Sequence, residues 1–263
     1  MAVTPERLAA GKMENSFRDA SDHVERYLID GATTLIGPAQ IATTHLICRS
    51  MADLRAGQYL VCEGFPLQMS SLVRPAIESI NLVELFAREP EMAASWAEGN
   101  HPEFTPAKVR ERLDLSEDSL YSWAAAHSHP RFAGFQLTTY LVTDEQGRET
   151  MRPCLGGLPL ELPQVLLATT MPGTILCELA GALGHCTVKE EVAYAWPTVA
   201  RSVGETVLPG FEAVYEALRE HGLKDNGAAE MLDVVREVIA SAAEMEKIVA
   251  EESGRASANS TST

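Results

Sequence analysis

Residues 14–35 read ENSFRDASDHVERYLIDGATTL, and this stretch decides the fold class. Small or apolar residues recur in it at intervals of three and four: Phe17, Ala20, Val24, Tyr27, Leu28 and Gly31. Because a helical turn holds about 3.6 residues, this repeat places an apolar stripe along one face of a helix. Gly37 and Pro38 then end the pattern. The stretch therefore predicts an amphipathic helix that packs against other helices.

The same helical pattern continues along the chain, with proline and acidic start signals and glycine stops. Pro66 removes a backbone donor, so we expect a break near Phe65 and a helix that restarts by Ser70. Further helices are predicted over residues 39–54, 59–87, 90–96, 105–113, 116–127, 165–184, 190–203, 208–220 and 228–251.

Residues 133–152 are the exception to the helical pattern. The run FQLTTYLVT at 135–143 is rich in β-branched and aromatic residues, and DEQG follows at 144–147 as a turn. The predicted fold is mainly α: a helical bundle of about eight to ten helices with a small β-hairpin insertion near residues 133–152. We expect a single helical domain over 14–251, a flexible N-terminus over 1–13 and a disordered tail over 252–263.

The charge balance and the cysteines limit the classes of partner and compartment. The 21 basic and 37 acidic residues give a net charge of -16 without a basic patch, which predicts no nucleic-acid partner. The five cysteines have no CxxC spacing and predict reduced, buried thiols. The segment 155–185 lacks Lys and Arg, but prolines and Glu161 and Glu178 interrupt it. We predict a kinked core helix, a cytoplasmic protein and no membrane partner.

Arg74 and Glu78 are the first candidate site residues. They lie four residues apart on a predicted helix with apolar neighbours, so both are expected to be partly buried. A buried Arg and a buried carboxylate must be paired, either as a structural ion pair between helices or as the polar floor of a site. The structural interpretation is the commoner one, because ion-pair networks often imitate sites.

His127 and His129 are the candidates for acid–base chemistry, because they follow a helix that carries Tyr121 and lie in a predicted loop. A metal site would need further converging ligands, and the sequence has no HExxH motif, so no metal is predicted. Phosphate-binding glycine loops and nucleophile elbows are missing too, so no cofactor is predicted. The alternative is that His127 caps the end of its helix while His129 is solvated.

Residues 45–185 carry Arg74, Glu78, Trp96, Gly99, Arg110, Tyr121, His127 and His129 at variable spacing. In this pattern the chain resembles uncharacterised bacterial helical proteins similar to the family of unknown function numbered 5677, a resemblance that implies no established activity. HEPN-type ribonucleases of toxin and phage-defence systems look broadly similar, and their signature is an Arg, four to six residues and a His on one helix. We take this signature to be missing. Its absence and the acidic net charge both argue against ribonuclease activity.

The leading functional prediction is a bacterial helical protein that binds a small anionic ligand or a protein partner. The polar cluster would be built from Arg74, Glu78, Arg110, Tyr121, His127 and His129, with Arg74, Arg110 and Tyr121 as the ligand-binding residues. The alternatives are an enzyme with His127, His129 or Glu78 in acid–base roles, and a phage-defence or toxin-type protein. Whether the chain is an enzyme stays open. A homo-oligomer is a further prediction, through an apolar face on residues 208–249.

Overall fold

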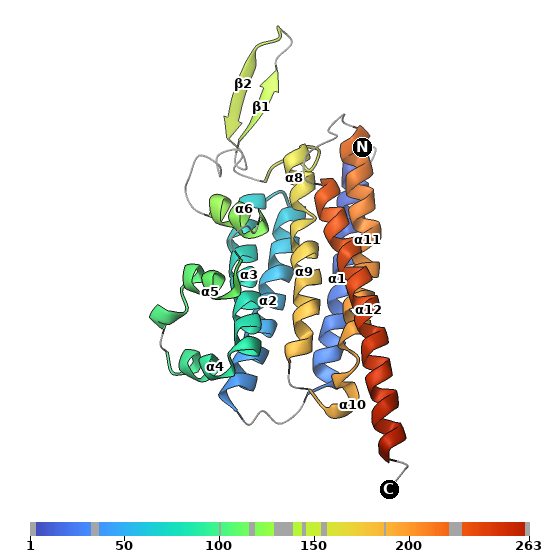
Figure 1. The fold of residues 1–263 in the computed structure, drawn as a ribbon. Helices are drawn as coiled ribbons and strands as arrows, with labels where there is room; N and C mark the ends of the chain where they lie inside the picture. The colour runs from blue at the N-terminus through green and yellow to red at the C-terminus, as the bar shows by residue number, and fades with distance from the viewer. Residues whose placement is uncertain are drawn as a thin grey trace.

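The computed structural model describes residues 4–32, 37–99, 101–115, 119–128, 139–143, 146–153, 157–186, 188–220 and 228–260, and it confirms a mainly α-helical bundle (Figure 1). The helices of the first half are α1 (Pro5–Asp30), α2 (Pro38–Cys62), α3 (Pro66–Arg88), α4 (Pro90–Ala97), η1 (His101–Glu103), α5 (Pro106–Leu113) and α6 (Ser119–Ser128). Strands β1 (Thr139–Thr143) and β2 (Glu149–Pro153) follow. The second half holds α8 (Pro163–Ala168), α9 (Met171–Ala182), η2 (Leu183–His185), α10 (Glu190–Ala193), α11 (Trp196–Glu220) and α12 (Ala228–Ser260).

Helix α9 is the centre of the bundle (Figure 1). Helices α2 and α3 pack on one side of it, and α1, α11 and α12 pack on the other. Ile175, Leu176 and Cys177 are fully buried there. The helical segment Pro163–His185 is the one described stretch that is long and apolar enough to cross a membrane, and 83% of that window is buried inside the protein. This burial agrees with the predicted core position of the segment.

Helix α1 begins at Pro5, so the prediction of a flexible N-terminus over 1–13 is wrong for residues 5–13. Thr4 caps the helix: its Oγ1 accepts a hydrogen bond from the backbone N–H of Arg7 at 3.3 Å. Proline stands at the first position and Glu6 in the first turn, where an acid favours the helix dipole. Met13 is fully buried against α11, which supplies the packing that the first turns need.

Two predicted breaks at glycine do not exist. Helix α2 runs unbroken through the predicted break at 55–58, and α11 runs unbroken through Gly204. A Cβ on Gly57 would lie 3.4 Å from Cγ of Met69 on α3, and one on Gly204 only 2.5 Å from Cγ1 of Ile239 on α12. Gly204 therefore lets α12 approach closely, whereas a Cβ on Gly57 would make only an ordinary contact with α3, and neither glycine ends a helix.

Of two other predicted helix boundaries, one is confirmed and one is wrong. The break near Phe65 is confirmed, because α2 ends at Cys62, Gly64 has φ 81° and α3 starts at Pro66. The C-terminal boundary is wrong, because α12 extends to Ser260 instead of ending at residue 251, so the predicted disordered tail over 252–263 is helical as far as residue 260. A continuous run of good helix formers precedes that boundary, so the helix continues past it.

Strands β1 and β2 pair antiparallel and project beyond one end of the bundle (Figure 1). Thr139 lies opposite Pro153, and Thr143 lies opposite Glu149. Residues 129–138 and 144–145 of the region lie outside the described residues.

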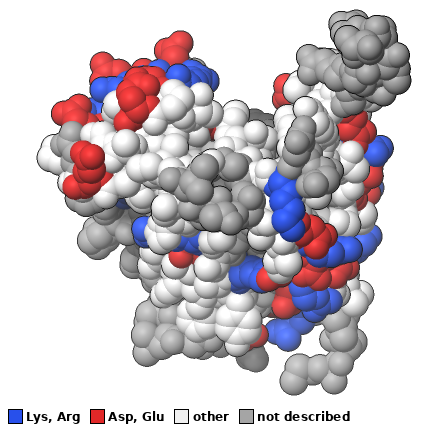
Figure 2. All heavy atoms as spheres, turned by 90° about the horizontal axis from the view of Figure 1, so that it is seen from below, with Lys and Arg blue, Asp and Glu red and all other residues white. Residues whose placement is uncertain are grey.

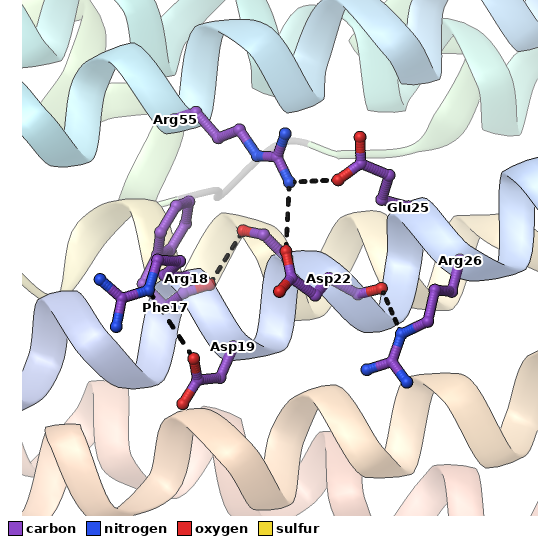
Figure 3. A network of polar contacts seen from close by, with 8 residues as sticks. Phe17, Arg18, Asp19, Asp22, Glu25, Arg26 and Arg55 are labelled. Atoms are coloured by element: carbon purple, nitrogen blue, oxygen red, sulfur yellow. Dashed lines mark hydrogen bonds and ion pairs between the residues drawn. The ribbon is translucent and has the colours of Figure 1, made fainter.

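A surface network of charges ties α2 to α1 (Figure 3). An Nη atom of Arg55, on α2, lies 2.7 Å from Oε2 of Glu25 and 3.6 Å from Oδ1 of Asp22, both on α1. Exposed ion pairs of this kind each stabilise by about 0–1 kcal/mol. The apolar core between the helices therefore contributes far more to the fold than this network does.

Candidate functional site

Arg74 and Glu78 form a closed ion pair on α3. The Nε–H of Arg74 donates to Oε1 of Glu78 at 2.8 Å, across one helical turn. The two side chains are 23% and 27% exposed, so the pair is partly sheltered from water. The predicted pairing and partial burial are both found, with the charges satisfied by each other.

Tyr121 and Arg110 complete the cluster from two further helices. The hydroxyl of Tyr121, on α6, donates to the same Oε1 of Glu78 at 3.3 Å. Cζ of Arg110, on α5, lies 4.4 Å from the centroid of the Tyr121 ring, and Cζ of Arg74 lies 5.7 Å from it. Both guanidinium groups are close enough for cation–π attraction to this one ring. The structure therefore brings together four of the six predicted site residues.

The position of Arg110 follows from the end of its helix. Asp114 caps α5 in the left-handed conformation, at φ 60°, and turns the chain back. Nη2 of Arg110 can then donate to the carbonyl oxygen of Leu115 at 2.6 Å. This contact orients the guanidinium beside Tyr121, so the α5 turn and the cluster are built together.

His127 lies inside α6, so the prediction that it lies in a loop is wrong, and its described contacts are with its own helix. The Nδ1–H of His127 donates to the backbone carbonyl of Trp123 at 2.7 Å, and its ring stacks on the Trp123 ring with centroids 4.4 Å apart. Both contacts lie within α6, in agreement with the alternative that His127 closes its own helix. His129 lies outside the described residues.

The positive charge of Arg74 is stabilised by its neighbours in the cluster. Burial acts to lower the pKa of Arg74, but hydrogen bonds and charge attraction from Glu78 and Tyr121 outweigh it and leave the pKa raised. The arrangement can hold an anion, because two fixed guanidinium groups match carboxylate or phosphate oxygens. No group of three His, Cys, Asp or Glu side chains that could hold a metal occurs within the described ranges.

The described thiols differ in burial and therefore in reactivity. Cys177 is buried and Cys48 exposed, so the prediction of uniformly buried cysteines is wrong for Cys48. Burial raises the pKa of Cys62 and of Cys186 to about 12, which leaves almost no thiolate at neutral pH. Cys154 lies outside the described residues.

The expectation that no Arg and His have the ribonuclease spacing is also wrong. Arg18 and His23 are separated by four residues on α1. The two side chains contact different partners: Nη2 of Arg18 donates to Oδ1 of Asn15 at 2.8 Å, and Nε2 of His23 lies 3.4 Å from Oγ1 of Thr206 on α11. The spacing is therefore present, while the described contacts do not draw the pair together.

The surface charges are mixed on the face seen from below, where Lys and Arg lie beside Asp and Glu (Figure 2).

Comparison with known proteins finds no match for this chain among protein-family models, curated proteins or solved structures.

Proposed function

We propose that this protein binds a small anionic ligand through the cluster of Arg74, Glu78, Arg110 and Tyr121. The observation that carries the proposal is the placement of two guanidinium groups beside one aromatic ring, at 4.4 and 5.7 Å from its centroid. Three helices supply the cluster, and packing limits how far each side chain can move. A carboxylate or a phosphate bound there would meet donors that are already oriented.

Glu78 has a defined part in this proposal, as the internal anion that a ligand must compete with. Its carboxylate accepts from Arg74 at 2.8 Å and from Tyr121 at 3.3 Å, so it occupies the position that a ligand oxygen would take. Neutralising Glu78 removes the competitor and leaves both guanidinium groups in place. Glu78→Gln should therefore raise the affinity for an anion if the cluster is a binding site, and leave it unchanged if the ion pair is purely structural.

The test is a thermal-shift titration with inorganic phosphate and with citrate, against sodium chloride at matched ionic strength. Glu78→Gln should bind these anions more tightly than wild type, and Arg74→Gln should lose the stabilisation. Arg112→Gln is the matched control, because Arg112 lies on α5 and pairs with Glu89 at 2.9 Å, away from Tyr121. Equal responses of all four proteins would show that the cluster is structural only.

A second candidate, a toxin-type or phage-defence ribonuclease, is favoured by one observation, the four-residue spacing of Arg18 and His23 on α1. The net charge of -16 opposes RNA binding. Incubation of single-stranded RNA with wild type and with His23→Ala tests it: cleavage by wild type alone would support a ribonuclease. An acid–base enzyme using His127 or His129 remains an untested prediction, as do the cytoplasmic location and the homo-oligomer.

We also propose that residues 133–152 form one inserted β-hairpin that the bundle does not need. The antiparallel register of β1 and β2 supports this, and Thr143 and residues 146–149 are exposed. Replacing residues 139–153 with a short Gly-Ser linker should leave the melting temperature of the bundle unchanged, because few apolar contacts are lost. A large loss of stability would show that this region packs on the bundle.

A further inference from the structure

A cleft of about 360 Å³ lies between α9, α11 and α12, on the other side of α9 from the α3–α5–α6 cluster. Its size is in the range of small-molecule pockets, about 300–1,000 Å³. Residues from all three helices line it, among them Cys177, Glu178, Gly181, Trp196, Glu237 and Met245. No sequence motif indicated this site, because its lining comes from three separate segments.

The floor and one wall of the cleft are apolar and fixed. Cys177 is fully buried at the base, and Ala242 is almost so. The indole of Trp196 packs tightly on η2: a Cβ on Gly184 would lie 2.9 Å from Cε2 of the ring. Only glycine at position 184 leaves room for the indole there. Trp196 therefore lines the cleft with an indole that η2 holds in position.

The charged groups of the cleft are acidic. Glu178 on α9 and Glu237 on α12 both line it, and none of its described lining residues is Lys, Arg or His. The neighbouring Arg201 on α11 is bound to acids, with Nε 3.0 Å from Oε2 of Glu246 and Nη1 3.6 Å from Oε1 of Glu205. An apolar cleft with carboxylates and an aromatic face favours a cation with an apolar body.

We propose that this cleft binds a small organic amine. The ammonium group lies against the carboxylate of Glu237, and the apolar body lies against Trp196 and Met245. Cation–π attraction to the indole and charge attraction to the carboxylates both require the positive charge. This site is independent of the anion-binding cluster, because the two sites select ligands of opposite charge and share no residue.

The experiment compares three probes of nearly equal shape: phenethylamine, phenethyl alcohol and phenylacetate. Binding is measured by isothermal titration calorimetry and by the fluorescence of the tryptophans. Phenethylamine should bind, and the alcohol and the acid should bind at least about tenfold more weakly, which corresponds to about 1.4 kcal/mol. Equal binding of all three probes would overturn the charge selectivity, and no binding of the amine would overturn the site.

Two variants place the binding in this cleft. Gly181 lines the cleft and a Cβ there meets no atom within 4 Å, so Gly181→Leu adds a side chain at the cleft without a clash at Cβ and should abolish binding of phenethylamine. Gly11→Leu is the matched control, because a Cβ there also meets nothing within 4 Å, and it should bind normally. Unchanged binding by Gly181→Leu would place the amine elsewhere and refute the proposal.

The contribution of charge is tested by Glu237→Gln, which should weaken binding of phenethylamine severalfold and leave binding of phenethyl alcohol unchanged. Glu244→Gln is the control on the same helix, because Glu244 is exposed, pairs with Lys247 at 3.1 Å and does not line the cleft. Equal losses for Glu237→Gln and Glu244→Gln would mean that the general negative charge of the protein, not the cleft, attracts the amine.

Discussion

Replacing Gly210 by alanine should loosen the contact between α1 and α11. Gly210 is buried on α11 and faces Met13 on α1. An added Cβ would lie 2.9 Å from Cα of Met13, 2.9 Å from its Sδ and 3.2 Å from Cβ of Ser16. The first of these atoms belongs to the backbone, so a side-chain rotation cannot relieve the clash and the two helices must separate.

The magnitude follows from two opposing contributions. Alanine is better than glycine inside a helix by about 1 kcal/mol, and overpacking a tight contact costs about 1–3 kcal/mol. Gly11→Ala on α1 isolates the first contribution, because its Cβ meets nothing within 4 Å. Gly11→Ala should therefore stabilise the protein, and the difference between the two variants should equal the overpacking cost of about 1–3 kcal/mol.

Urea denaturation followed by circular dichroism measures both variants, and unchanged slopes show that the midpoints report stability. The melting temperature should differ between them by roughly 2–4 °C for each kcal/mol. If Gly210→Ala stabilises the protein as much as Gly11→Ala does, then Met13 does not pack against α11. In that case residues 5–13 would not belong to the bundle.

Two further predictions concern ionisable side chains. Burial raises the pKa of Asp53, against the lowering effect of Arg49 at 3.7 Å, so the folded state prefers the protonated acid. The stability that the protonated acid contributes is present below the ordinary pKa of Asp and is lost as pH rises through the pKa of Asp53 in the folded state. Asp53→Asn should therefore raise the melting temperature at neutral pH, and raise it by less at acidic pH. An equal rise at both pH values would exclude this linkage. Among the described thiols, exposed Cys48 should react with iodoacetamide first and buried Cys177 only on unfolding, which mass spectrometry of the peptides reports; early labelling of Cys177 would contradict its burial.

Much of the helical architecture could be predicted because the pattern that forms a helix is local. The apolar repeat from Phe17 to Tyr27 becomes the buried stripe of α1, and the proline at position 66 starts α3 as its chemistry requires. Predictions of helix ends failed where packing against a distant helix determines whether the helix continues. Gly57 and Gly204 were predicted to separate helices, but both helices continue through them, and at Gly204 helix α12 approaches too closely for a side chain.

In the candidate site, too, the local contacts could be predicted and the contacts between helices could not. The pairing of Arg74 with Glu78 depends on a spacing within one helix and could be predicted. The contact of Glu78 and Arg74 with Tyr121 depends on how α6 packs on α3. The family resemblance, and not the residue spacing, suggested that these residues belong together. The start of α1 could have been found from Thr4, Pro5 and Glu6, a complete capping signal that the sequence does contain.

The central position of α9 separates the two candidate sites and makes their independence measurable. The cluster lies among α3, α5 and α6, and the cleft lies among α9, α11 and α12, so α9 is the element that packs toward both layers. Effects at sites without shared contacts add to within about 0.3–0.5 kcal/mol. The double variant Arg74→Gln with Gly181→Leu should therefore lose both ligands and show the summed change in stability. A clear excess over the sum would mean that α9 couples the anion site to the amine site, since no described residue belongs to both.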